Sequence, residues 1–126
     1  MDRNMGSVKV PAGLRALGIE VVTLSERYGV HEGQWIEDIK WMLAAAEAGE
    51  VVLMSDDAIR RKNPVERRVL IACKLQAFVV NASIPPAETV RRFEVSLRAI
   101  ARACRRPGPY VYRLHPKKIE LLPLKE

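Results

Sequence analysis

Apolar and polar positions along the chain follow two patterns, one typical of buried strands and the other of amphipathic helices. Continuous apolar or β-branched runs predict strands at residues 19–24, 51–54 and 78–81. Apolar residues spaced at about 100° per residue predict helices over 10–18, 34–48, from Asn63 toward Gln76, and from Pro85 to Arg106. Two last stretches, 109–114 and 118–123, predict a closing hairpin.

Turn and capping residues support these boundaries. Gly18 and Gly49 follow the first two helical patterns, where glycine commonly ends a helix. In the segment 63–66, Asn caps a helix, Pro occupies its first turn and Glu stands three residues after the cap. The alternation of strands and helices predicts an α/β fold, with a mainly parallel sheet flanked by helices in a single domain over 1–126.

Composition agrees with one globular domain. The chain has 126 residues, 48% of them hydrophobic and 29% charged. No apolar run reaches the roughly 18 residues of a membrane helix, and the N-terminus lacks the apolar run of a secretory signal. We therefore expect a cytoplasmic protein that does not contact a membrane. Cys73 and Cys104 lie within apolar helical patterns, so we expect reduced thiols in the core.

Charge divides the chain into two unequal halves. Residues 1–59 carry ten acidic and five basic side chains, whereas residues 60–126 carry five acidic and sixteen basic ones. A basic half of this kind favours a polyanionic partner. Solvated helix faces explain the same excess of basic residues, so the charge alone does not identify a binding site.

In parallel α/β sheets, functional residues usually lie beyond the carboxyl ends of the strands, and aspartates are the candidates here. Asp56 and Asp57 follow the run at 51–54, Asp2 precedes the first helix, and Asp38 borders the apolar stripe of the second. Carboxylates gathered there require a cation, and an all-oxygen set suits magnesium or manganese. Each aspartate taken alone is equally well a cap, a turn residue or a solvated charge. His31 and His115 belong to no catalytic or metal-binding motif.

Several segments together carry a family resemblance. They are DRN at 2–4, GIEVVTL at 18–24, DIKWM at 38–42, VVLMSDDAIRRKNPVER at 51–67, FVV at 78–80 and PGPYVYRL at 107–114. In this order, with 18 residues from Asp38 to Asp56, the chain resembles the PIN-like domains of VapC-type toxins from toxin–antitoxin pairs. The resemblance implies a three-layer fold with a C-terminal pair of strands, and magnesium- or manganese-dependent cleavage of RNA. It also implies a cognate antitoxin and a homodimer.

The resemblance assigns roles to particular residues. Asp2, Asp38 and Asp56 would be the catalytic, metal-binding acids, and Glu26 a further ligand. A run of basic residues after Asp56 would hold the RNA backbone: Arg60, Arg61, Lys62, Arg67 and Arg68.

The chain departs from the family pattern in two places. Met54 stands where threonine or serine is usual, and only Met1 precedes Asp2, although that aspartate usually ends the first strand. We therefore expect a truncated first strand. A PIN-like scaffold that binds RNA or protein without cutting remains an alternative. A receiver-type signalling domain is another, but Asp56 and Asp57 follow a middle strand and no lysine follows FVV.

Overall fold

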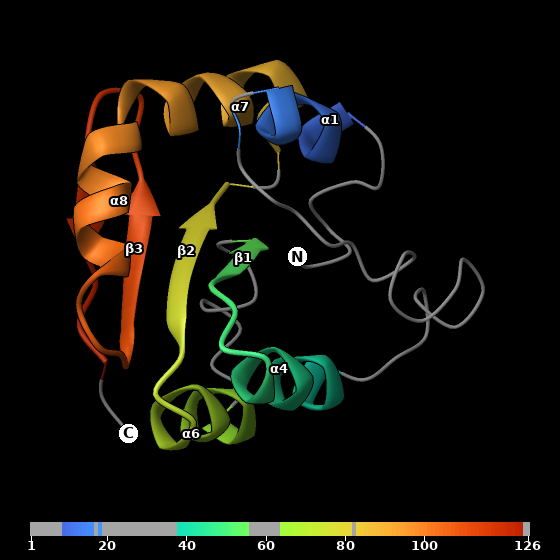
Figure 1. Ribbon diagram of the computed structural model, residues 1–126, viewed down its shortest axis with the longest axis vertical. Helices are drawn as coiled ribbons and strands as arrows, with labels where there is room; N and C mark the ends of the chain where they lie inside the picture. The colour runs from blue at the N-terminus through green and yellow to red at the C-terminus, as the bar shows by residue number, and fades with distance from the viewer. Residues whose placement is uncertain (1–8, 17, 19–37, 56–63, 82, 125–126) are drawn as a thin grey trace.

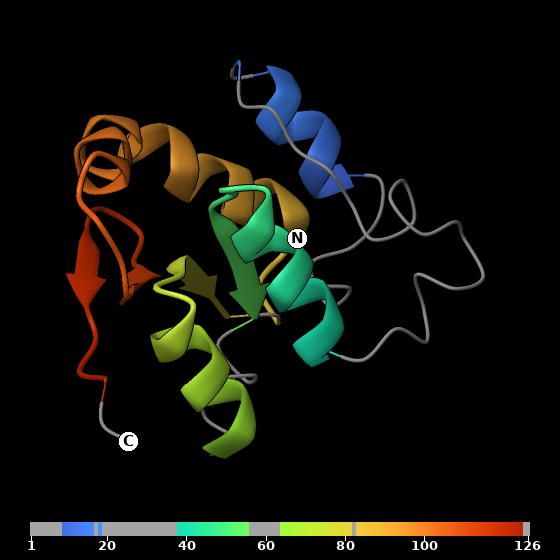
Figure 2. The ribbon, with the colours of Figure 1, turned by 60° about the horizontal axis from the view of Figure 1, so that its bottom comes forward.

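The computed structural model describes residues 9–16, 18, 38–55, 64–81 and 83–124, with the backbone alone at 10, 38, 39, 55 and 64–66. These residues form a three-layer α/β structure, in which a sheet lies between two groups of helices (Figures 1 and 2). The α/β class and the sheet flanked by helices, both expected from the sequence, are confirmed. None of the described helices is long and apolar enough to cross a membrane.

The sheet of the described chain has the strand order β1-β2-β3-β4. Its strands are β1 (Val52–Ser55), β2 (Gln76–Val80), β3 (Tyr110–Leu114) and β4 (Ile119–Leu121). The first three run parallel, and β4 returns antiparallel to β3 as the expected hairpin. The carboxyl ends of β1, β2 and β3 therefore lie along one edge of the sheet, called the carboxyl edge below. The opposite edge is called the amino edge.

Side chains of the parallel strands alternate between two cores. On one face, Leu53, Phe78 and Val80 pack under α1 (Lys9–Ala16), α7 (Pro86–Val95) and α8 (Leu97–Cys104). On the other face, Val52, Met54, Ala77, Val79 and Val111 pack under α4 (Asp38–Glu47) and α6 (Pro64–Ala72). Since helices cover both faces, the continuous apolar runs of the sequence are accounted for.

Helices α4 and α6 end in the same way and lead directly into strands. After α4, Glu50 N donates to Ala45 O at 2.9 Å and Gly49 has φ +68°. After α6, Leu75 N donates to Leu70 O at 3.0 Å and Lys74 has φ +54°. Both are Schellman ends, which need a residue in the left-handed region. Lysine costs about 1 kcal/mol more than glycine in that conformation.

This helix end corrects two boundaries expected from the sequence. The helix from Asn63 was expected to continue toward Gln76, but α6 ends at Ala72, and Gln76 is the first residue of β2. The strand expected at 78–81 accordingly begins two residues earlier and ends at Val80. A lysine in the position of the usual glycine gives no sequence signal for the end of the helix.

The helix expected from Pro85 to Arg106 is two helices, with a bend at Ser96. Buried positions Thr89, Phe93, Ser96, Ile100 and Ala103 follow one another at spacings of three and four residues. This pattern predicts one straight helix, which would be roughly 30 Å long at 1.5 Å per residue. Five-residue strands span only about 17 Å. The bend at Ser96 keeps both halves on the core (Figure 1).

Side chains from two strands hold the last turn of α8. Gln76 Nε2 donates to Cys104 O at 3.0 Å and to Arg106 O at 2.5 Å. The Tyr110 hydroxyl donates to Ala103 O at 2.6 Å, and burial raises the pKa of Tyr110 to about 12. Gln76 and Tyr110 begin β2 and β3, so the C-terminus of α8 lies at the amino edge.

An arginine ties α7 to the other end of β3. Arg92 Nη1 donates to Leu114 O at 3.1 Å, and Arg92 Nε donates to Glu88 at 2.8 Å. Arg91 binds both Glu88 oxygens, at 2.6 and 2.8 Å. Hydrogen bonds from Arg91 and Arg92 lower the pKa of Glu88 to about 2.

The cysteines are free, as expected from the sequence. Both are half-buried rather than fully buried, and each packs against one of the two cores; Cys73 directly follows α6 and Cys104 is the last residue of α8. Burial raises the pKa of the Cys104 thiol.

Gly108 lies where the turn into β3 crosses the end of α6, and its substitution tests this close approach. A Cβ there would collide with the Lys74 carbonyl oxygen and lie 2.7 Å from that of Leu75. We expect Gly108→Ala to lower the unfolding free energy by roughly 3 kcal/mol in urea titration, because backbone cannot move aside as a side chain can. Gly49→Ala is the control. Open space surrounds a Cβ at that position, so only the left-handed backbone lowers the unfolding free energy, by about 1 kcal/mol. Equal losses in both variants would contradict the close approach.

The lowered pKa of Glu88 predicts a pH dependence of stability. A carboxyl whose pKa falls on folding stabilises the protein above its ordinary pKa of 4.5, and this contribution is lost as pH falls toward 2. Glu88→Gln should therefore be less stable than wild type at neutral pH, and the difference should shrink between pH 4.5 and 2. Chemical unfolding at a series of pH values measures this. Glu94→Gln on the same helix is the control, and a constant offset between Glu88→Gln and wild type would refute the linkage.

Candidate functional site

The carboxyl edge collects the ends of elements that are distant in sequence. Helix α4 reaches β1 through the tight turn at Gly49 and runs back along it, so its first turn lies at this edge (Figure 2). Asp38 is the first residue of α4. Trp41 and Met42, one turn later, are 2% and 0% exposed and fix the helix on the sheet. The backbone of Asp38 is thereby held at the carboxyl edge.

Asp56 follows Ser55, the last residue of β1. Every described side chain of β1 is buried, which fixes the point at which the chain reaches the edge. Asp56 itself lies outside the described residues, as do Asp2, Glu26 and Asp57. The meeting of the Asp38 and Asp56 carboxylates stays a prediction, and so does the truncated first strand. What the structure brings together is the first turn of α4 and the exit of β1.

Met54 departs from the threonine or serine of the family pattern. Its side chain is 2% exposed and packs with Met42 and Val52 in the core beneath α4 and α6. The methionine therefore serves packing.

A polar pair that sequence reasoning missed follows β2. Ser55 pairs with Val80, so Asn81 leaves β2 at the level where Asp56 leaves β1. Asn81 Oδ1 accepts from Ser83 N at 2.9 Å and from Ser83 Oγ at 2.7 Å. These bonds fix the Asn81 amide at the end of β2. The signal was present, since a polar residue follows the buried FVV, but Asn81 was counted as part of the strand.

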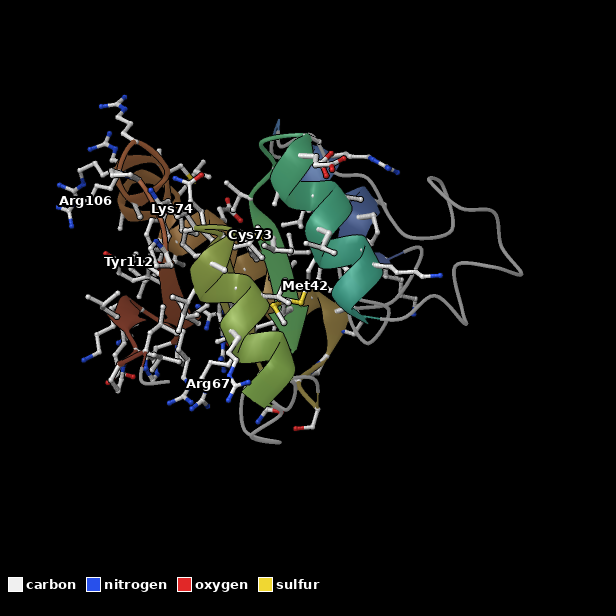
Figure 3. The ribbon with its side chains drawn as sticks, turned by 90° about the horizontal axis from the view of Figure 1, so that it is seen from below. Met42, Arg67, Cys73, Lys74, Arg106 and Tyr112 are labelled. Atoms are coloured by element: carbon white, nitrogen blue, oxygen red, sulfur yellow. The ribbon has the colours of Figure 1, made fainter. Side chains whose placement is uncertain are left out.

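The expected RNA-binding residues lie on α6 or just before it. Arg60, Arg61 and Lys62 are outside the described residues. Arg67 is half-buried in the first half of α6, and Arg68 beside it is exposed. Figure 3 shows Arg67 at the far end of α6 from Lys74. The structure thus places Arg67 toward the carboxyl edge and Lys74 at the amino edge.

His115 lies in the connection between β3 and β4, where its contacts are structural. Its Nε2 lies 2.8 Å from Glu120 Oε1, and this hydrogen bond lowers the pKa of Glu120. His115 N also donates to Lys118 O at 2.8 Å and closes the turn. The histidine thus stabilises the connection between β3 and β4.

Possible metal ligands at the edge are carboxylates. Among the described residues, no group of three or more His, Cys, Asp or Glu side chains could hold a metal ion. The expected set would therefore combine Asp38 with acids outside the described residues. A set made only of carboxylates fits a hard cation such as magnesium or manganese.

Comparison with known proteins bears directly on this edge. The family described as "PIN like domain" matches residues 1–82, which include α4, β1, α6 and β2. The chain is 42% identical over 120 residues to the Mycobacterium tuberculosis (strain ATCC 25618 / H37Rv) protein named "Putative ribonuclease VapC45". That alignment covers 94% of this chain and 86% of the relative. No solved structure matches the chain.

The family match spans α4 and β1, whose ends meet at the carboxyl edge, and the identity to the mycobacterial protein extends over nearly the whole chain. The resemblance seen in the sequence is confirmed: this chain belongs to the PIN-like domain family.

Proposed function

We propose that the protein is a metal-dependent endoribonuclease and the toxin of a toxin–antitoxin pair. The observation that carries this proposal is the convergence of the first turn of α4, which begins with Asp38, on the end of β1, which leads into Asp56. The name of the mycobacterial relative, a VapC ribonuclease, supports the same reaction.

The acids at the edge would hold the metal. Asp38 and Asp56 would be ligands from two rigid elements, and Asp2 and Glu26 would complete the set. A bound magnesium or manganese ion would lower the pKa of water and neutralise charge on the phosphodiester. Ligands on a helix and at a strand end keep their positions better than ligands on long loops. Asp38 and Asp56 are therefore the acids that we expect to matter most.

Basic side chains beside the acids would hold the RNA. Helix α6 begins at the carboxyl edge, so Arg67 and Arg68 in its first half lie toward the acids. With Arg60, Arg61 and Lys62 they would bind phosphates and orient the scissile bond. Asn81, at the end of the neighbouring strand, could donate its amide to the same backbone.

The proposal also covers the protein partners and the cellular location. By analogy with VapC-type toxins, a cognate antitoxin would cover the acidic edge, and two copies of the chain would pair. The protein would act in the cytoplasm, where RNA is available.

Asp56→Asn tests the mechanism. The change keeps the shape of the side chain and removes one ligand charge, so we expect cleavage of a mixed RNA pool to fall by about 100-fold or more with the fold intact. Asp57→Asn, on the next residue, is the control and should leave the rate within a few-fold of wild type. Cleavage that a chelator does not stop, or an active Asp56→Asn variant, would contradict the proposal. RNA binding without any cleavage would favour the scaffold alternative.

Magnesium should stabilise the folded protein by mass action. At a concentration 100 times the dissociation constant, a site present only in the folded state adds about 2.7 kcal/mol. We expect magnesium to raise the melting temperature of wild type, and to raise that of Asp38→Asn much less. Differential scanning fluorimetry over a magnesium series measures both, with Glu47→Gln at the other end of α4 as the control. A magnesium response in Asp38→Asn equal to that of wild type would remove Asp38 from the metal site.

A further inference from the structure

Helix α8 carries a row of arginines that the proposed cleavage site does not use. Arg98, Arg102 and Arg105 recur at spacings of four and three residues, and Arg106 follows. All four are exposed, while Ile100 and Ala103 on the opposite side of the helix face the core. Lys74 is also exposed, and Figure 3 shows it on the same side of the molecule as Arg106. These five residues are called the arginine face.

These arginines are not needed to cap the helix. Basic residues often gather at a helix C-terminus, where they bind the last carbonyl groups. In α8 those carbonyls are already bound: Gln76 donates to Cys104 and Arg106, and Tyr110 donates to Ala103. The guanidinium groups are therefore available to a ligand.

Their charge is not neutralised within the described residues. No ion pair or side-chain hydrogen bond joins any residue of the arginine face to another described side chain, and residues 97–106 contain no acid. Arg91 and Arg92 on α7 differ, because both bind Glu88. Unpaired positive charges so close together repel one another, and an anionic ligand would relieve that repulsion.

Lys74 stands where a glycine would be more stable. Its φ of +54° ends α6 as Gly49 ends α4, yet a lysine occupies the position. A charged residue held in a strained conformation often has a role beyond the fold. Here it adds a positive charge beside the C-terminal end of α8, and the carbonyl of Lys74 packs against Gly108 of the next loop.

The arginine face extends along the molecule away from the acids. Arg92, one turn before α8, binds the carboxyl end of β3, and the last turn of α8 binds the amino ends of β2 and β3. From Arg98 to Arg105 the helix advances about 10 Å at 1.5 Å per residue. A polyanion lying on α8 would thus run between the carboxyl edge and the amino edge.

We propose that the arginine face binds the sugar–phosphate backbone of single-stranded RNA outside the cleavage site; this rests on the proposed function. Protein interfaces have apolar anchors at their centre and few charges there. Two exposed large apolar residues, Val95 and Leu97, lie at the bend beside Arg98, and none lies between Arg98 and Arg106. Evenly spaced cations without an apolar centre fit a phosphate backbone better than a protein segment.

Salt-dependent binding tests the proposal. Fluorescence anisotropy would follow a labelled oligouridylate of about 16 nucleotides, with chelator present so that the RNA stays intact. The slope of log affinity against log salt is negative, and in Arg98→Gln/Arg102→Gln/Arg105→Gln its magnitude should decrease by about 2. Each lost single-strand phosphate contact removes about 0.7. An oligouridylate of about 4 nucleotides can occupy the cleavage site or the arginine face but not both, so the variant should lose a smaller part of its slope with this RNA.

Two variants separate specific contacts from net charge. Lys9→Gln/Lys40→Gln/Lys117→Gln removes three exposed charges elsewhere and should keep the slope within about one contact of wild type. Replacing the three arginines by lysine keeps the charge and should retain most of the slope. An unchanged slope in Arg98→Gln/Arg102→Gln/Arg105→Gln would overturn the proposal. An equal loss of slope in Lys9→Gln/Lys40→Gln/Lys117→Gln would do the same. So would a polyglutamate peptide that binds this face more tightly than the RNA, which would assign it to an acidic protein segment.

Lys74→Gly gives an independent readout. Glycine suits the left-handed conformation, so the melting temperature should rise while affinity for the longer RNA falls. A purely structural lysine would change stability alone, and a variant that binds as tightly as wild type would remove Lys74 from the arginine face. Since none of these measurements needs cleavage, an inactive enzyme that binds through α8 would sink the proposed function but not this inference. An active enzyme whose RNA affinity does not depend on the α8 arginines would contradict this inference and leave the proposed function intact.

Discussion

Burial of the parallel strands on both faces is the constraint on which the rest of the structure depends. A strand whose every side chain is buried needs a layer of helices above it and another below it. Phe78 and Val79, neighbours in β2, each belong to a different core. Because the strands run parallel, the same constraint sends all their carboxyl ends to one edge. The candidate site thus follows from the packing of the sheet, before any acid is considered.

Sequence patterns predicted those parts of the fold that rest on local signals. The strand at Val52–Ser55 and the glycine end of α4 were marked by an apolar run and by Gly49. The end of α6 was missed because a lysine at position 74 adopts the conformation that glycine usually provides. The bend at Ser96 was missed because an unbroken apolar stripe gives no measure of how far the sheet beneath it extends.

The candidate site divides in the same way. Asp38 and Asp56 could be proposed from sequence, since each stands beside an apolar run that fixes its element. Contacts such as Asn81 with Ser83, or Arg92 with the carbonyl of Leu114, could not. The first depends on where a strand stops, and the second joins residues 22 positions apart, for which no periodicity exists. Polar contacts between elements become visible only once the elements are packed.

The arm formed by α7 and α8 holds β3 at both of its ends. Arg92 binds the carbonyl of its last residue, and its first residue, Tyr110, binds the last turn of α8. Separating the arm from the strand would break both polar anchors and uncover the ring of Tyr110, which contacts Phe78 and Tyr112 within the sheet. We therefore expect residues 86–114 to behave as one cooperative unit, whose amide protons exchange with solvent together. The C-terminal third of the chain would then open and close as a single piece.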